Sequence, residues 1–381
     1  MFTRLYLHIP FCLSKCPYCA FASVDTDAFR AEYPHLLAAE REIAATECAP
    51  SSPLESVYFG GGTPSLLPPE AVGRLLEDIA CHWGLADGAE ITIEANPGTV
   101  DRVRMEHFRA AGINRISLGV QSFDDRQLAM LGRAHDAHQA LQAFEGARAA
   151  GFDNIGIDLI HSLPGQTLTQ WISHLRQAVS LAPDHISSYG LTIEEGTPFA
   201  ERYPEDSPRL PDGELSADMY EAAADHLTAA GYQHYEIANF ALPGRQSRHN
   251  SGYWRREGYL GLGAGAHSFL RPPPHGFRFC TTPDLEDYAR AVTGGRLPRQ
   301  ELTRLSDHDA MAEFMFLGLR MADGISIAAF RDEFGVSPDE AFGSALAELE
   351  QYGLVQREDD TLRLSRRGML LSNRVFGRFI A

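Results

Sequence analysis

The stretch Phe11-Cys12-Leu13-Ser14-Lys15-Cys16-Pro17-Tyr18-Cys19-Ala20-Phe21 places three of the chain's six cysteines within eight positions. It follows a β-like run, residues 4–9, and its prolines disfavour regular structure. A structural zinc site normally takes four protein ligands, and the nearest fourth candidate, His8, lies on the preceding strand. Three cysteines with an open fourth position favour a 4Fe-4S cluster that has one iron free for a non-protein ligand. A zinc site and merely buried thiols are the alternatives.

The composition is that of a globular protein with an acidic surface. The 381 residues are 44% apolar and 22% charged, which allows one barrel-sized domain and a smaller one. The sequence has neither a long apolar run nor a signal-peptide pattern, so it predicts a cytoplasmic protein that meets membranes only peripherally, through a partner. The net charge of −18 disfavours nucleic acid and anionic lipid as partners. The other cysteines lack paired spacing, which indicates a reducing compartment.

Short β-like runs alternate with amphipathic helical patterns through the first half of the chain. The predicted strands are residues 4–9, 56–59, 90–94, 115–120, 154–160 and 185–191. The predicted helices are residues 27–46, 69–82, 101–111, 124–130, 137–150 and 168–181. Six successive βα units predict an α/β fold with a parallel sheet, closed or partly closed like a barrel.

The second half of the chain has a different pattern. Proline-rich breaks interrupt residues 192–298, where we expect a helix over 212–230 and then irregular structure or short strands. Helices over 306–321, 326–334 and 338–352, followed by strands at 354–357 and 361–364, predict a smaller winged-helix-like domain. Because this region is acidic, we expect it to pack or to bind a partner rather than DNA. The predicted divisions are a core over 1–230, a connecting segment over 231–300 and a C-terminal domain over 301–381.

Polar or glycine residues follow several of the predicted strands. They are Gly60-Gly61-Gly62-Thr63, Glu94, Gln121, Arg133 and Asp158. Each one alone is as easily explained as a cap, a turn residue or a buried structural pair. The carboxyl ends of parallel strands converge on one mouth, however, so we expect these groups to surround the cysteine loop. Together they could bind ribose hydroxyls, an ammonium group and a carboxylate.

With these motifs, the sequence resembles the radical S-adenosylmethionine superfamily. The resemblance lies in Cys12-x3-Cys16-x2-Cys19 with an aromatic residue at Tyr18, and in a glycine loop of the HemN-like branch, where Gly62-Thr63 replaces the usual Glu. It implies a partial (β/α)6 TIM-like barrel whose cluster is chelated at its open iron by S-adenosylmethionine. It also implies a reductant as partner, because the reduced cluster of this superfamily cleaves the sulfonium to a 5′-deoxyadenosyl radical. The matching positions imply S-adenosylmethionine contacts at Tyr6, Gly61, Gly62, Thr63, Glu94, Gln121, Arg133 and Asp158.

Within that branch, the sequence is more similar to haem chaperones of the HemW type than to oxygen-independent coproporphyrinogen III oxidases. The oxidases carry a fourth cysteine where this chain has Phe21, and an N-terminal extension where eleven residues precede Cys12. The motif Arg248-His249-Asn250-Ser251-Gly252-Tyr253-Trp254 looks like the His-Asn-x-x-Tyr-Trp motif of the chaperones. The resemblance implies delivery of haem to acceptors such as respiratory-chain proteins, and haem contacts at His249, Asn250, Tyr253 and Trp254.

The haem ligand itself has alternatives in the sequence. An imidazole can ligate haem iron, and aromatic rings offer flat faces to a macrocycle. An isolated His is otherwise a core residue held by a hydrogen bond, and this reading applies to His249 as well as to His267, the second candidate ligand. An oxidase and a regulator that senses iron or redox state stay open as functions. The oligomeric state is also open, a homodimer included.

Overall fold

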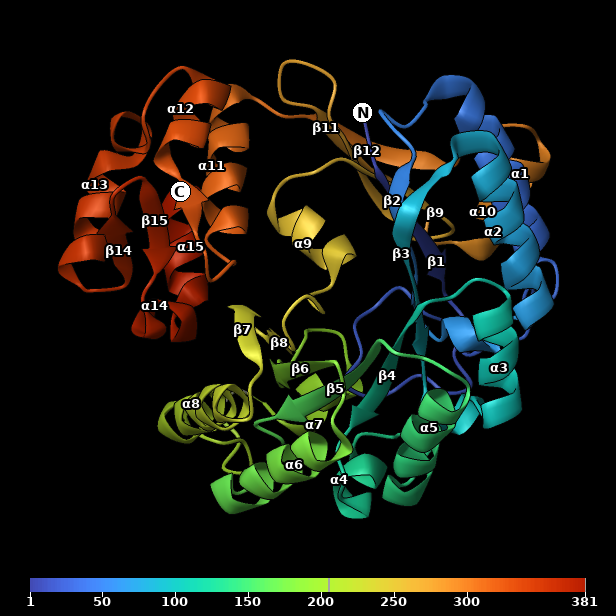
Figure 1. Ribbon diagram of the computed structural model, residues 1–381, viewed down its shortest axis with the longest axis horizontal. Helices are drawn as coiled ribbons and strands as arrows, with labels where there is room; N and C mark the ends of the chain where they lie inside the picture. The colour runs from blue at the N-terminus through green and yellow to red at the C-terminus, as the bar shows by residue number, and fades with distance from the viewer. Residues whose placement is uncertain (205, 381) are drawn as a thin grey trace.

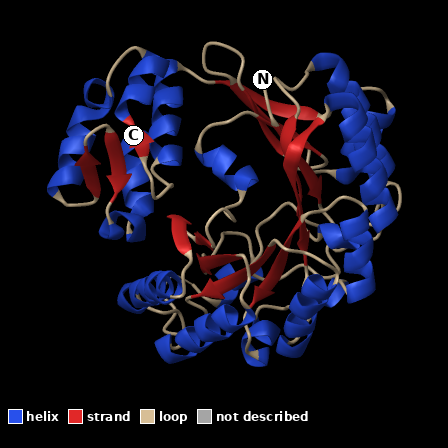
Figure 2. Cartoon of the chain, viewed as in Figure 1, coloured by secondary structure: helices blue, strands red, loops and turns tan. Residues whose placement is uncertain are grey.

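A twelve-stranded mixed sheet curves through the larger part of the protein in the computed structural model, which describes residues 1–204 and 206–380 (Figures 1 and 2). Its six central strands are parallel and follow the order of the chain. They are β1 (Arg4–Ile9), β2 (Leu54–Gly61), β3 (Leu85–Ala95), β4 (Arg115–Gln121), β5 (Ile155–His161) and β6 (His185–Gly190). The predicted α/β core of six βα units is therefore confirmed.

Helices cover the convex side of this sheet (Figure 1). They are α1 (Tyr33–Glu47), α2 (Pro69–Trp83), α3 (Arg102–Ala110), α4 (Asp125–Met130), α5 (Ala137–Ala149) and α6 (Leu168–Leu181), with short 3-10 turns η1 (Pro64–Leu66) and η2 (Pro97–Thr99). Side-chain caps begin several of them, for example Asp136 on α5 and Thr167 on α6. Helix α1 begins at Tyr33 rather than at residue 27, because Pro34 is accommodated in the first turn of a helix but not inside it.

The two faces of the central strands differ in chemistry because side chains alternate along a strand. Apolar residues such as Phe59, Ile93 and Leu118 are buried in the core that the sheet forms with the outer helices. Alternate residues such as Tyr58, Glu94 and Ser117 line a cavity. The concave side of the sheet is thus polar, which leaves it free to form a binding site.

The chain then extends both edges of the sheet. After α7 (Pro198–Arg202) and α8 (Gly213–Ala229), strands β7 (Gln233–Glu236) and β8 (Asn239–Ala241) continue the sheet beyond β6. The chain crosses to the opposite edge through α9 (Arg248–Trp254), which lies on the concave side (Figure 1). There β9 (Tyr259–Leu262) pairs parallel with β1, followed by β10 (His267–Leu270), β11 (Phe277–Thr281), α10 (Leu285–Thr293) and β12 (Arg299–Arg304). The sheet ends at β12 and β7, so the barrel is open.

The C-terminal domain has its own core and its own sheet. Its elements are α11 (Asp307–Gly318), β13 (Ile325–Ser326), α12 (Ile327–Phe334), α13 (Pro338–Gln351), β14 (Val355–Glu358), β15 (Thr361–Leu364), α14 (Arg366–Leu370) and α15 (Ser372–Ile380). The strands form a small sheet in the order β13-β15-β14, against which the helices bury residues such as Phe330, Leu346 and Phe379. The winged-helix-like prediction is confirmed, with two final helices that the sequence pattern did not predict. Among the described residues, no helix is both long and apolar enough to cross a membrane.

A buried arginine joins the two parts of the chain. Arg256 directly follows α9 and is 2% exposed, and its guanidinium donates to Glu333 of α12 at 2.7 Å and to Glu313 of α11 at 3.4 Å. Arg278 of β11 donates to the same Glu313 at 2.7 Å. The segment after α9 is therefore attached to the C-terminal domain by a shared network of ion pairs.

Candidate functional site

A cavity of about 410 Å³ opens at the carboxyl ends of the parallel strands. It brings together the three clustered cysteines and most of the polar residues that the sequence placed at strand ends. These lining residues are Cys12, Cys16, Cys19, Gly61, Gly62, Thr63, Glu94, Gln121, Arg133 and Asp158. The convergence expected from the order of the strands is what the structure shows.

The cysteine loop is held by hydrogen bonds to the surrounding backbone. The Cys12 amide donates to the Val24 carbonyl at 2.8 Å, and the Lys15 ammonium donates to the Phe21 and Ser23 carbonyls at 3.4 and 3.3 Å. Lys15 thus links the middle of the loop to its C-terminal end. The three thiols share the cavity, although the described residues contain no preformed group of three metal ligands.

Two polar side chains approach the thiols. The Thr63 hydroxyl lies 3.7 Å from Cys12 Sγ, and Arg133 Nη1 lies 3.6 Å from Cys16 Sγ while Nη2 donates to the Gly119 carbonyl at 2.8 Å. Burial raises the pKa of the Cys12 thiol, and the Thr63 hydroxyl opposes that rise. Donors of this kind stabilise thiolate sulfur, which is the form that binds iron.

The glycine loop allows a close approach between β2 and the cysteine loop. A Cβ on Gly62 would lie 2.7 Å from the Phe11 carbonyl oxygen, and one on Gly61, whose φ is +114°, would lie 2.8 Å from the His8 ring. The Gly62 amide donates to Ile9 and the Thr63 amide donates to Phe11, each at 2.8 Å. Only glycine fits at these two positions, because a side chain would separate the two loops.

Two half-buried carboxyl groups lie farther along the cavity. Glu94 accepts hydrogen bonds from the Tyr58 hydroxyl at 2.7 Å and from the Gly61 amide at 3.3 Å, and burial raises its pKa to about 7. Burial also raises the pKa of Asp158, to which the Ser117 hydroxyl donates. Gln121 lines the same cavity with a φ of +66°, a strained conformation of the kind found at binding sites.

The donor set of this cavity fits a 4Fe-4S cluster together with S-adenosylmethionine. Three thiols provide soft ligands at one end, and carboxylates and a guanidinium provide polar partners beside them. The buried Arg133 Nε atom has no hydrogen-bond partner among the described residues, so the site has unused donor capacity for a bound carboxylate. Tyr6 does not line the cavity, but its ring lies 6.1 Å from the ring of Tyr58, which does.

The His249 motif occupies α9 in the interior of the protein. His249 is 1% exposed, and its two ring nitrogens are hydrogen-bonded to Ser56 at 2.8 Å and to Tyr253 at 2.7 Å. Burial lowers the pKa of this imidazole well below its usual value, so the ring is neutral. Asn250 lines the cofactor cavity, whereas Trp254 packs beneath the Arg320 guanidinium, 4.2 Å from the ring centroid. The structure therefore directs these four side chains into different surroundings.

His267, in contrast, is exposed at the start of β10. The β9–β10 turn adjoins the cysteine loop, since a Cβ on Gly265 would lie 2.9 Å from the Ala22 Cβ. Phe21 and Leu13 in that loop are 69% and 55% exposed. His267 is thus available to a ligand without rearrangement, and the reading of His267 as a core residue is wrong.

The sequence did not single out several side chains that line the cavity. They are Tyr58, Arg115, Ser117, His185, Ser187 and Tyr189. The two-residue period of a strand could have identified some of them, because residues an even number of positions apart face the same side of the sheet. Ser117 precedes Gln121 by four positions, and Tyr58 precedes Gly62 by four. Arg115 is 1% exposed, and two of its nitrogens have no partner among the described residues.

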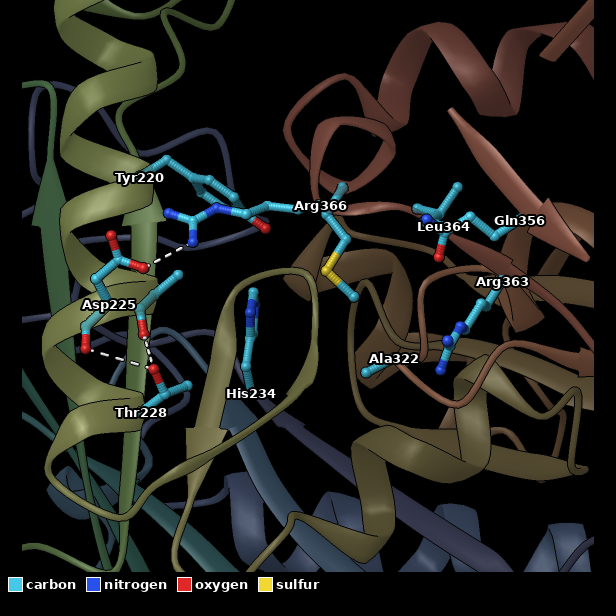
Figure 3. Close-up of a pocket in the computed structure, with 11 residues that line it drawn as sticks. Tyr220, Asp225, Thr228, His234, Ala322, Gln356, Arg363, Leu364 and Arg366 are labelled. Atoms are coloured by element: carbon cyan, nitrogen blue, oxygen red, sulfur yellow. Dashed lines mark hydrogen bonds and ion pairs between the residues drawn. The ribbon is translucent and has the colours of Figure 1, made fainter. Parts of the chain in front are cut away.

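A second cavity, of about 290 Å³, lies between α8 and the C-terminal domain (Figure 3). Its charged groups largely pair with protein groups: Arg366 donates to Asp225 at 2.7 Å, and Arg363 donates to Glu358 at 2.7 Å. His234 points into it from β7, with one ring nitrogen bonded to the Ile237 carbonyl at 3.1 Å (Figure 3). Of these interactions, the Arg366–Asp225 pair connects the two domains. The cysteine cavity is the candidate site.

Comparisons with known proteins agree with this geometry. Residues 6–178 match the model of the radical SAM superfamily, and residues 305–371 match the HemN C-terminal domain. The fold and the cysteine cavity thus define a protein with a radical SAM domain. The chain belongs to the HemW family: it is 35% identical to "Heme chaperone HemW" of Bacillus subtilis (strain 168) over 98% of each chain.

Further relatives bear the same name. The chain is 36% identical to "Heme chaperone HemW" of Haemophilus influenzae, over 99% of this chain and 97% of the relative. It is 43% identical to that of Escherichia coli (strain K12), over 71% and 70%. Among solved structures, coproporphyrinogen III oxidase (HemN) from Escherichia coli, described as a radical SAM enzyme, is similar with a TM-score of 0.85 and 25% identity, covering 99% of this chain and 90% of that one.

Proposed function

We propose that this protein is a haem chaperone, which binds haem and transfers it to haem-requiring proteins. The observation that carries the proposal is similarity over nearly the whole length, both domains included, to proteins named as haem chaperones. Phe21, in the place of the oxidases' additional cysteine, supports the same choice. The proposed acceptors are respiratory-chain proteins. We propose that the chaperone reaches them from the cytoplasm and contacts the membrane only through the acceptor.

We propose that Cys12, Cys16 and Cys19 hold a 4Fe-4S cluster and that S-adenosylmethionine completes its coordination. When bound and reduced, the cluster would supply the electron for one-electron cleavage of the sulfonium of S-adenosylmethionine. The proposed contacts of S-adenosylmethionine are Tyr6, Gly61, Gly62, Thr63, Glu94, Gln121, Arg133 and Asp158. Of these, Arg133 provides free donors for a carboxylate, and Glu94 and Asp158 provide acceptors for an ammonium group and for ribose hydroxyls.

For haem, we propose contacts from the α9 motif, His249, Asn250, Tyr253 and Trp254. Both His249 nitrogens are already bonded inside the protein, so ligation of haem iron by this residue requires α9 to leave its position. His267 is the alternative ligand, because its exposed imidazole needs no such movement. The Soret band separates the two: His249→Ala alters it if α9 opens, and His267→Ala alters it if haem binds at the exposed site.

The test of the function is a haem titration of the cluster-loaded protein beside an assay of coproporphyrinogen III conversion in the same preparation. Stoichiometric haem binding, transfer to an apo-acceptor and no conversion are expected. The similarity to the HemN structure makes the oxidase the second candidate. Turnover to protoporphyrinogen IX would replace the proposed function with that activity.

A further inference from the structure

His249 lies against the residue that holds Glu94, and its surroundings suggest a task unrelated to iron. We infer that His249 is a positioning residue of the cofactor cavity: it fixes the Tyr58 ring, whose hydroxyl orients the Glu94 carboxylate. This inference goes beyond haem transfer. It rests on the proposed assignment of Glu94 to S-adenosylmethionine.

The first step is the bond between Tyr58 and Glu94. The Tyr58 hydroxyl donates to one carboxylate oxygen at 2.7 Å, and the Gly61 amide donates to the other at 3.3 Å. Tyr58 is therefore one of the two groups that determine how this carboxylate faces the cavity. Its hydrogen bond also favours the ionised form of a carboxyl group that burial makes hard to ionise.

The second step is the stacking of Tyr58 on His249. The ring centroids are 5.0 Å apart and the planes are inclined by 30°, while Tyr6 lies on Tyr58 at 6.1 Å and 26°. The Tyr6 and His249 rings also lie 6.4 Å from each other, so the three rings form a triangular cluster in which Tyr58 contacts both of the others. An aromatic pair of this kind contributes orientation as well as buried area.

The third step is the fixation of the imidazole. Ser56 on β2 and Tyr253 on α9 bond its two nitrogens, and Glu90 accepts its backbone amide at 3.0 Å. Ser56 and Tyr58 are alternate residues of β2, so they present their side chains on one face. His249 therefore cannot turn without breaking a bond, and the next residue of α9, Asn250, lines the cavity.

The experiment measures the affinity of cluster-loaded protein for S-adenosylmethionine from pH 6 to pH 9 without haem. Wild-type affinity should rise with pH as Glu94 loses its proton. His249→Ala should weaken binding at pH 7 by roughly three- to tenfold, the typical contribution of an aromatic pair. It should also move the pH midpoint upward, because a released Tyr58 no longer stabilises the carboxylate.

Variants separate positioning from general damage. His249→Gln keeps a planar group that can bond Tyr253 and should restore most of the affinity. Arg255→Ala, at the exposed end of the same helix, should leave affinity and midpoint unchanged. Tyr58→Phe keeps the ring but removes the hydroxyl, so it should move the midpoint upward and should not add to the effect of His249→Ala. If His249→Ala does not fold, Ser56→Ala, which removes one of the two hydrogen bonds that hold the imidazole, takes its place in the cycle with Tyr58→Phe.

Glu94→Gln distinguishes failure of this inference from failure of the cofactor assignment. If Glu94→Gln weakens binding while the folded His249 and Tyr58 variants keep the wild-type affinity and midpoint, the positioning role is wrong. If Glu94→Gln itself leaves binding unchanged, Glu94 is not a contact of S-adenosylmethionine, and the inference fails with that assignment. Neither result depends on haem transfer.

Discussion

Buried ionisable side chains set the chemistry of individual positions in this protein. Glu94 and Asp158 sit in the cavity with raised pKa values, and Glu40 on α1, outside that cavity, accepts from the Gly263 amide and the Tyr288 hydroxyl at 2.7 and 2.8 Å. Each such carboxyl is stabilised in its neutral form by burial and in its charged form by its donors.

Replacement of one cluster cysteine should abolish the cluster. Cys16→Ser removes one of three thiols in the cavity, so the reconstituted protein should lose its brown absorbance and its stoichiometric iron and sulfide. Cys81→Ser is the matched control, because Cys81 is exposed and outside the cavity. Retention of a full complement of iron and sulfide by the Cys12, Cys16 and Cys19 triple variant would show that these residues are not the ligands.

Glu40 should make the stability of the protein depend on pH. Burial raises the pKa of its carboxyl to about 7, above the ordinary value near 4.5, so its contribution to stability is full below that ordinary value and is lost as the pH rises through 7. We expect Glu40 to lower the free energy of unfolding by about 3 kcal/mol between pH 4.5 and pH 8. Urea titrations across this range measure it: Glu40→Gln should flatten the profile, whereas exposed Glu42→Gln should not. An unchanged slope in Glu40→Gln would contradict the assignment.

The regular elements of the first half were predictable because each carries a local signal. β1 to β6 are largely apolar runs, four of which end at glycine or a polar residue, and α5 and α6 begin at capping residues. After the helix over 212–230 we expected irregular structure or short strands, but the pattern gave neither the bounds nor the pairing of β7 to β12, because these strands are three to six residues long and are held by pairing within the sheet. The position of α9 was not predicted either, because nothing in its seven residues indicates that the helix lies inside the curved sheet.

In the candidate site, too, some features have a local signal in the sequence and others depend on distant contacts. The ends of parallel strands meet by geometry, so the surroundings of the cysteines followed from the order of the elements. The partners of His249 did not, because Ser56 lies 193 positions away in the chain. Contacts of that range depend on how the sheet curves, which a motif of six residues does not specify.

The glycine loop at the end of β2 offers a test at the scale of an element. Gly62→Ala places a Cβ within 2.7 Å of a backbone oxygen of the cysteine loop, so the two loops must separate. We expect a lower yield of reconstituted cluster and a stability loss of about 1–3 kcal/mol. Gly213→Ala, where a Cβ meets nothing within 4 Å, is the control. Wild-type cluster content in Gly62→Ala would mean that the close approach is dispensable.

In the whole molecule, the core and the C-terminal domain depend on each other through buried charge. Arg256 connects Glu313 and Glu333, and Arg278 and Arg271 share these two carboxylates. Trp254, at the end of α9, contacts Arg320 of the C-terminal region. Asn250, which lines the cofactor cavity, and Trp254, which contacts the C-terminal region, therefore lie near opposite ends of one short helix.

Removal of Arg256 should loosen the contact between the domains. Arg256→Met removes one of the two arginines that pair with each carboxylate, since Arg278 still pairs with Glu313 and Arg271 with Glu333, so we expect a cost of about 1–3 kcal/mol. We expect a lower unfolding midpoint and faster proteolytic cleavage between the domains, near residue 305. Arg331→Met, on the exposed side of α12, should behave like the wild type. Equal cleavage rates for the two variants would contradict a joining role for Arg256.

The position of β1 in the sheet affects when, during synthesis, the cysteine loop becomes supported on both sides. The strand that leads into the cysteine loop is bordered on one side by β2 and on the other by β9, which starts at Tyr259. A nascent chain that emerges from the ribosome in order thus exposes one edge of its first strand until two thirds of the protein has been made. Iron and sulfide delivered before that moment would meet a loop supported on one side only, so the structure favours metallation after β9 has been made.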